Sequence, residues 1–194
     1  MLNEIFDRIV VLNLDRRVDR LEAFDKQAKE LGFTYQRFSA YEGNPPEFTF
    51  RDACKKGHQE IMKQAIDDGV NRLFIFEDDA TFVECFSDKL RDVYNKLPKD
   101  WDMFYLGAWH NTFSNYVDGL VRMTDSYSTH AYGINGHYLN KAYDSTFNSM
   151  PVDIALSMRH PHIQAYCAKP ALVYQAAGFS DIEKEYRDFQ DKYL

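Results

Sequence analysis

"NRLFIF" (residues 71–76), followed at once by "EDDATF" (77–82), joins an apolar strand to a cluster of carboxylates. A short apolar run of this kind is typical of a strand that is buried on both faces of a sheet. Glu77, Asp78 and Asp79 follow where that strand is expected to end. Because like charges this close repel one another, the triplet is unfavourable unless a cation or a hydrogen-bond donor lies beside it.

Strands and helices alternate on both sides of this stretch. Strands are expected over 8–14, 33–38, 71–76, 101–107 and 164–173, with a hairpin within 117–135. Helices are expected over 21–31, ended by Gly32, over 51–67, 86–96 and 137–149, and from a start near Asp153. Such alternation predicts an α/β sheet with helices on both faces.

The carboxyl ends of the expected strands carry most of the chemically interesting residues. In open α/β sheets, ligands bind beyond these ends. The rule places 15–20, 77–79 and 107–110 on one rim of the sheet. Topology alone therefore predicts a site there.

Length, charge and composition bound the class of protein. A chain of 194 residues, 45% of them hydrophobic, suits one well-packed domain. The net charge of -7 argues against nucleic-acid or anionic-membrane binding. No apolar run approaches the ~20 residues of a membrane span, and no signal peptide is recognised at the start. Three scattered cysteines, Cys54, Cys85 and Cys167, indicate reduced thiols, so a cytoplasmic protein is expected.

The acidic triplet has two interpretations. Hard divalent cations such as Mg²⁺ and Mn²⁺ prefer carboxylate oxygens, usually together with substrate phosphates. A tight turn after the strand would let Glu77 and Asp79 share such an ion. Alternatively the triplet is a solvated turn in which Asp79 or Thr81 caps the following helix.

"NLDRRVDR" (13–20) follows the first expected strand and also has two interpretations. Arg16, Arg17 and Arg20 carry guanidinium groups that can grip a diphosphate. A solvated helix start, with Asp15 as its cap and Asp19 paired to an arginine, is the alternative.

Three further candidates remain open in the same way. Cys54 and His58, four apart on a helix, can hold a metal or form a buried thiol above a hydrogen-bonded histidine. Asp153 can be a helix N-cap or a general base. Trp109 and His110 can face a sugar ring or belong to the core.

Eight segments, taken in order, resemble a known family. They are "RIVVLNLDRRVDRLEAF" (8–24), "FSAYEG" (38–43), "ACKKGH" (53–58), "FEDDATF" (76–82), "WDMFYLG" (101–107), "HAYGIN" (130–135), "PVD" (151–153) and "KPALVYQAAGFSDI" (169–182). Their order and spacing are similar to those of glycosyltransferase family 25, which includes lipooligosaccharide and procollagen galactosyltransferases. Ala53 stands where the family has Gly, and Gly57 where it has Ser.

The resemblance implies a GT-A fold, a Rossmann-like mixed sheet flanked by helices, as one domain over residues 1–194. It also implies a UDP-sugar donor, a divalent cation (Mn²⁺ or Mg²⁺) and inversion at the sugar carbon. By that analogy Asp79 is the direct metal ligand, Glu77 supports it, and Asp78 faces the ribose or the ion. Asp153 is the expected catalytic base, with Asp181 in reserve.

The expected substrate-binding residues are Asn13, Leu14, Asp15, Arg16, Arg17, Arg20, Asp78, Gly107, Trp109, His110, Gln175 and Ser180. The leading hypothesis is a hexosyltransferase that moves galactose or glucose from a UDP-sugar to a hydroxyl of a glycan or a hydroxylated peptide. The alternative is a non-catalytic module that keeps the fold and binds a nucleotide or glycan. Oligomeric state does not follow from the sequence.

Overall fold

A computed structural model of the chain describes residues 1–188 and 193. The helices are α1 (Leu2–Ile5), α2 (Val18–Leu31), α3 (Phe50–Asp67), α4 (Phe86–Lys96), α5 (Gly136–Ser145), α6 (Val152–Ser157) and the 3-10 turn η1 (His160–His162). The strands are β1 (Arg8–Asn13), β2 (Gln36–Ser39), β3 (Arg72–Glu77), β4 (Ala80–Phe82), β5 (Met103–Tyr105), β6 (Trp109–Val117), β7 (Leu120–Tyr127), β8 (Ala131–Asn135), β9 (Ala165–Ala168), β10 (Val173–Gln175), β11 (Gly178–Ser180) and β12 (Glu185–Arg187).

Eight strands form one mixed sheet in the order β2-β1-β3-β8-β5-β9-β7-β6. β1 pairs in parallel with β2 and β3, whereas β8 runs antiparallel between β3 and β5. β3 and β5 therefore point the same way, and their carboxyl ends meet at one edge. The predicted α/β sheet is confirmed, and the rim expected from topology exists.

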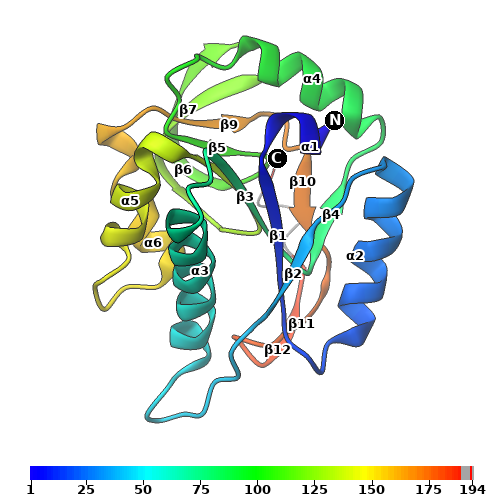
Figure 1. The fold of residues 1–194 in the computed structure, drawn as a ribbon, viewed down its shortest axis with the longest axis vertical. Coiled ribbons are helices and arrows are strands. Elements are labelled where there is room, and N and C mark those ends of the chain that lie inside the picture. Colours follow the sequence, from blue (N-terminus) through cyan, green and yellow to red (C-terminus); the bar gives the residue numbers. More distant parts are fainter. Residues whose placement is uncertain (189–192, 194) are drawn as a thin grey trace.

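Helices cover both faces of the sheet, as Figure 1 shows with α2 on one side and α3, α5 and α6 on the other. Phe24 of α2 and Leu90 of α4 are fully buried with Phe74 and Phe76 of β3 in one core. A second core on the opposite face joins α3, α5 and α6 to the sheet. Because β3 alternates its side chains between the two faces, this central strand serves both cores.

The two helices that border the site have clear end signals, of which Gly32 is predicted from the sequence; α2 begins at Val18 rather than at residue 21. Gly32 ends α2 in a left-handed conformation (φ 69°), which glycine adopts without steric cost. Thr49 caps α3 and forms a reciprocal capping box with Asp52. The predicted helices over 51–67 and 86–96 correspond to α3 and α4.

Several predicted boundaries are wrong. The segment 33–38 is strand only from Gln36, because Phe33 turns inward and stacks on Phe76. The strand expected over 164–173 is two strands, β9 and β10, separated by Pro170, which has no amide hydrogen to donate. The hairpin is formed by β6 and β7, whereas 131–135 is the separate central strand β8. The strand expected over 101–107 covers only β5, and the helix expected over 137–149 ends at Ser145.

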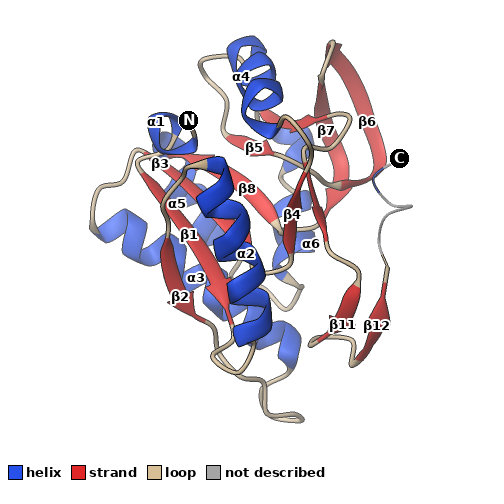
Figure 2. Cartoon of the chain, turned by 90° about the vertical axis from the view of Figure 1, so that its right-hand side faces the viewer, coloured by secondary structure: helices blue, strands red, loops and turns tan. Residues whose placement is uncertain are grey.

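Two small strand pairs stand outside the main sheet. β4 pairs with β10, and β11 pairs with β12 in a hairpin that lies to the side of the main sheet, at lower right in Figure 2. The β11–β12 hairpin thereby brings late residues of the chain to the rim that was expected from early ones. Within the described residues, no helix is both long and apolar enough to cross a membrane.

Candidate active site

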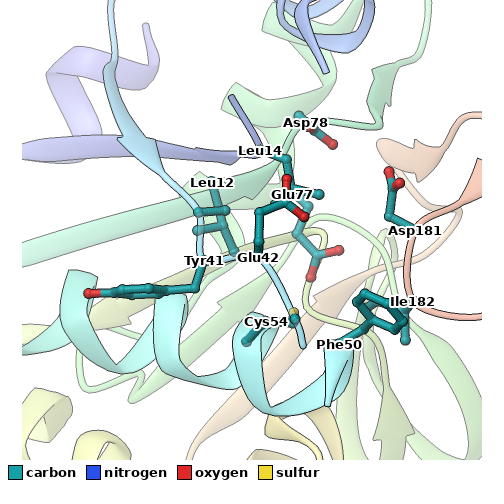
Figure 3. A pocket seen from close by; sticks show the side chains of 13 residues that line it. Leu12, Leu14, Tyr41, Glu42, Phe50, Cys54, Glu77, Asp78, Asp181 and Ile182 are labelled. Carbon is teal, nitrogen blue, oxygen red and sulfur yellow. The ribbon is translucent and has the colours of Figure 1, made fainter. Parts of the chain in front are cut away.

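A cleft of about 320 Å³ opens at the carboxyl edge of the sheet. We refer to it as the main cleft; its lining includes Arg20, Cys54, Glu77, Asp79, Trp109, Thr129, Asp153, Gln175, Ser180 and Asp181. A smaller side pocket of about 90 Å³ lies beside it, lined by Leu14, Cys54, Glu77, Asp78 and Asp181 among others (Figure 3). The two cavities share Cys54, Glu77, Asp181 and Ile182, so they lie side by side.

The acidic triplet lies at the end of β3 and in the turn that follows it. Glu77 is the last residue of β3, and Asp78 and Asp79 form the turn into β4. Since a strand and not a helix follows, the interpretation of Asp79 or Thr81 as a helix cap is wrong. The next helix, α4, begins after Cys85.

Asp78 is held by two donors on the α2 side. Asn13 Nδ2 donates to Asp78 Oδ2 at 2.7 Å, and Arg20 Nη1 donates to Asp78 Oδ1 at 2.9 Å. Burial raises the pKa of Asp78, while Arg20 and Asn13 oppose that shift. Asp78 therefore lines the side pocket and anchors the start of α2 to β3.

Asp79 is left short of partners. Its Oδ2 lies 3.3 Å from Arg20 Nη1 and 3.5 Å from Gln175 Nε2. Its Oδ1 is buried and has no hydrogen-bond partner among residues 1–188 and 193. Burial, followed by the charge of Glu77, raises the pKa of Asp79 to about 7. An unsatisfied carboxylate oxygen beside a second carboxylate fits a hard divalent cation.

Glu77 faces the opposite direction from Asp78, toward α3 and β8. Thr129 Oγ1 donates to Glu77 Oε1 at 2.7 Å, and His58 Nε2 lies 3.4 Å from the same oxygen. Burial opposes ionisation of Glu77, but His58 and Thr129 outweigh it and lower its pKa. Glu77 is thus a carboxylate kept ionised at the wall that the two cavities share.

Arg16 and Arg17 form ion pairs with the β11–β12 hairpin. Asp181 accepts hydrogen bonds from Arg16 Nη2 at 2.6 Å and from Arg17 Nη1 at 2.5 Å. Arg17 also pairs with Asp19, as predicted. Asp15 does not cap α2, because its carboxylate bonds to Arg37 and Ser39 instead.

Asp153 lines the main cleft. It lies inside α6, whose N-cap is Pro151, so its interpretation as an N-cap is wrong. The Ile154 amide donates to Asp153 Oδ1 at 2.9 Å, and no ion pair to Asp153 occurs within the described part of the chain. Burial raises the pKa of Asp153, and the charge of Glu77 adds to that shift. A carboxylate of raised pKa in a cleft is suited to accept a proton.

The structure brings half of the predicted site residues into the main cleft. These are Arg20, Glu77, Asp79, Trp109, Asp153, Gln175, Ser180 and Asp181. Gly107 does not line the cleft. A Cβ at this position would lie 2.0 Å from the Val173 carbonyl oxygen, so the glycine allows the two backbones to pack closely. His110 is also outside the main cleft, and its Nδ1 lies 2.6 Å from Ser126 Oγ. Burial and the charge of Lys169 lower the pKa of His110 to about 4.

Other residues of the cleft were missed by the sequence interpretation. Thr129 contacts Glu77 only because β8 pairs antiparallel with β3, a pairing that the sequence alone does not reveal. Arg51 and Glu183 form an ion pair at 2.8 Å on the cleft wall between α3 and the β11–β12 hairpin. A loop of small and polar residues, "GFSDIEKE" (178–185), was the available signal for this hairpin.

Comparison with known sequences gives a family. The sequence model described as glycosyltransferase family 25 (LPS biosynthesis protein) matches residues 50–166, more than half of the chain. Procollagen galactosyltransferase 2 of Mus musculus is 24% identical over 219 residues, which cover 87% of this chain and 35% of the relative. The Homo sapiens protein of the same name is also 24% identical, with the same coverage. The chain thus spans about a third of the length of these curated relatives.

Comparison with solved structures supports the fold. A glycosyltransferase involved in the glycosylation of the major capsid of PBCV-1 matches with a TM-score of 0.57 at 10% identity, covering 91% of this chain and 95% of that one. A197 from STIV matches with a TM-score of 0.56 at 11% identity, covering 92% of each chain. At such identities the likeness concerns the fold, and it confirms the predicted GT-A type sheet flanked by helices.

Proposed function

The chain belongs to glycosyltransferase family 25, and from that premise we propose that it moves galactose or glucose from a UDP-sugar to an acceptor hydroxyl with inversion. The main cleft supports this proposal, because two carboxylates of different character share it. Within the described residues, Asp79 has a buried oxygen without a hydrogen-bond partner and Asp153 forms no ion pair. Since the cleft draws on residues from Arg20 to Glu183, we propose that these elements act as one catalytic domain.

Asp79 and Glu77 are the residues that would hold a divalent cation, Mn²⁺ or Mg²⁺. Bound there, the cation would offset the negative charge that develops on the diphosphate as the sugar leaves. Arg20 contributes fixed positive charge at the same wall through its contacts with Asp78 and Asp79. The observation that favours this assignment is that Asp79 Oδ1 has no hydrogen-bond partner among the residues that the structure describes.

Arg16 and Arg17 are the second source of positive charge. They lie at the start of α2 and bind Asp181 in the structure. A donor diphosphate offers the same kind of oxygen acceptor as that carboxylate. We therefore propose that these arginines bind the donor. To do so, they would release the Asp181 carboxylate and bind phosphate oxygens of the donor instead.

Asp153 is the proposed general base. It accepts the proton of the acceptor hydroxyl while that oxygen attacks the anomeric carbon and the bond from this carbon to the diphosphate oxygen breaks. Asp181 is the weaker candidate, because both of its oxygens are bonded to arginines and its pKa is lowered. A carboxylate held in two ion pairs is a poor proton acceptor.

The acceptor class is taken from the relatives. The curated relatives are named procollagen galactosyltransferases, which favours galactose as the sugar and a hydroxylated peptide as one acceptor to test. The family description refers to LPS biosynthesis, which favours a glycan as the other. Trp109, on the wall of the main cleft, offers an aromatic surface to a sugar ring.

The test is release of UDP from a panel of UDP-sugars, with Mn²⁺ and then with chelator. Slow hydrolysis of the donor by water reports the donor sugar even without an acceptor. We expect turnover of UDP-galactose or UDP-glucose that the chelator abolishes. Nucleotide binding in calorimetry without turnover of any donor would instead support the non-catalytic binding module.

A further inference from the structure

Cys54 and His58, one turn apart on α3, face Glu77 across the wall between the two cavities. Each residue offers one ligand atom, and these three atoms lie within 4.8 Å of one another. They are a thiol sulfur, an imidazole nitrogen and a carboxylate oxygen. Figure 3 shows Cys54 on α3 and Glu77 beside it at the side pocket. Helix geometry alone puts the first two residues on one face, and β3 supplies the third.

His58 is oriented as a metal-binding histidine would be. Its side chain is fully buried, and Nδ1 lies 2.9 Å from the Tyr132 hydroxyl. Nε2 is buried too and has no hydrogen-bond partner in the described part of the chain. In the tautomer with its hydrogen on Nδ1, His58 donates to Tyr132 and presents the lone pair of Nε2 to Cys54 and Glu77, whereas the other tautomer presents the Nε2 hydrogen to Glu77. Histidines that bind metals generally donate from their other ring nitrogen to a fixed partner, as in the first of these tautomers.

A simple ion pair between His58 and Glu77 explains the contact less well. The distance from Nε2 to Glu77 Oε1 is 3.4 Å, longer than the 2.7–2.9 Å usual for a charged hydrogen bond. Thr129 already donates to that oxygen at 2.7 Å. The helix that carries His58 is also closely fitted, because a Cβ at Gly57 would lie 2.7 Å from Leu12 Cδ1. A fixed nitrogen that has no hydrogen-bond partner among the described residues, beside a sulfur and a carboxylate, indicates a missing ligand.

We propose that Cys54, His58 and Glu77 form a binding site for a thiophilic divalent cation such as Zn²⁺, separate from the hard-cation site proposed at Asp79. Sulfur, nitrogen and oxygen ligands together are typical of zinc, whereas Mg²⁺ and Mn²⁺ prefer oxygen. Three protein ligands leave a fourth position for water, and Cys54 and Glu77 both border the main cleft. On binding, the Cys54 thiol gives its proton to solvent and coordinates as thiolate. The site shares Glu77 with the proposed function, so occupancy of one site affects the other.

Co²⁺ added to the metal-free full chain, without nucleotide, tests the site. Co²⁺ takes zinc ligand sets, and a thiolate bound to it gives a charge-transfer band in the near ultraviolet. We expect this band with one Co²⁺ per chain, and expect Zn²⁺ to abolish it by displacement. Cys54→Ser should remove the band, His58→Gln should weaken Co²⁺ binding at least tenfold, and Tyr132→Phe should weaken it about 10- to 100-fold.

Two controls separate this site from its surroundings. Cys85→Ser removes an exposed thiol and should leave the band unchanged. Asp79→Asn should also leave it unchanged, although the hard-cation site would be lost. A wild-type chain without the band, or a band that survives in Cys54→Ser, would overturn the proposal. Because neither donor nor turnover enters the measurement, failure here is distinguishable from failure of the transferase proposal. Circular dichroism of each variant confirms that loss of the band is not loss of fold.

Discussion

The carboxylates at this edge of the sheet fall into two groups that differ in how they are neutralised. In the group next to α2, which we term the arginine side, Asp78 and Asp181 are both bound by arginines. The shortest contacts are 2.9 Å from Arg20 to Asp78 and 2.5 Å from Arg17 to Asp181. These pairs hold the start of α2 to β3 and to the β11–β12 hairpin.

The second group, which we term the carboxylate side, consists of Glu77, Asp79 and Asp153. Among the described residues, one buried oxygen of Asp79 has no hydrogen-bond partner although the other contacts Arg20, and the pKa values of Asp79 and Asp153 are both raised. Carboxylates that are close together in the sequence therefore have different roles: those of the arginine side hold the fold together, and those of the carboxylate side are left to bind a ligand. The comparison teaches that, for predicting a ligand site, the number of acidic residues matters less than whether neighbouring side chains satisfy each carboxylate oxygen. Where they do not, as at Asp79, we expect a ligand to do so.

The largest effect is expected from Asp79→Asn on the carboxylate side. The substitution keeps the shape of the side chain but removes the charge that the proposed cation requires. We expect kcat/KM for the donor to fall about 10³-fold, or about 4 kcal/mol of transition-state stabilisation. The melting temperature should stay the same or rise, since a buried repulsion with Glu77 is relieved. Near wild-type turnover would show that the cation is held elsewhere.

Asp153→Asn should produce the next largest loss. As the proposed base, Asp153 contributes at least about 10²-fold to transfer. Affinity for the UDP-sugar, measured by calorimetry, should be unchanged. The matched variant is Asp181→Asn, which lies in the same cleft but should alter donor affinity more than the transfer step. If transfer survives in Asp153→Asn and fails in Asp181→Asn, the two roles are exchanged.

On the arginine side, Arg20→Gln should lower stability. Asp78 would be left buried beside Asn13 alone, so a loss of about 2 kcal/mol is expected in urea unfolding. Arg16→Gln is the matched control, because 45% of the Arg16 side chain is exposed as against 18% for Arg20. Its effect should stay below about 0.5 kcal/mol. Equal losses in the two variants would remove the distinction between anchored and surface arginines.

The smallest expected effect concerns Asp181 and pH. Burial opposes its ionisation, but Arg16 and Arg17 outweigh burial and hold the pKa of Asp181 below its usual value of 3.8. A lowered pKa in the folded chain stabilises at pH values above the unfolded pKa, and this stability is lost as pH falls through the folded pKa. Asp181→Asn should therefore cost about 1 kcal/mol at pH 7. The difference from wild type should shrink below about pH 4, and a difference that is constant to pH 2 would contradict the ion pairs.

Sequence reasoning located the rim and several of its residues because these depend on local patterns. β1 and β3 are apolar runs, and parallel pairing brings Asn13 and Glu77 to one edge whatever the rest of the chain does. Gly32 likewise marks the end of α2 through its own backbone conformation.

What sequence reasoning missed depends on pairing between distant segments. The direction of Asp79 is set by β4, which pairs Phe82 with Val173 of β10. Asp181 reaches Arg16 and Arg17 only because the β11–β12 hairpin returns to α2. The third member of the Cys54 and His58 cluster comes from β3 and has no signature in the spacing of these two residues. Non-local contacts of this kind are decided by packing of the whole domain rather than by any one segment.

Binding of Mn²⁺ tests the contrast between the arginine side and the carboxylate side most directly. Electron paramagnetic resonance of free Mn²⁺ is followed during titration of the metal-free chain, with and without UDP. We predict that wild-type and Asp181→Asn chains bind one Mn²⁺ that UDP makes tighter, whereas Asp79→Asn loses this binding. Equal Mn²⁺ binding in wild type and Asp79→Asn would contradict the assignment of the cation to the carboxylate side.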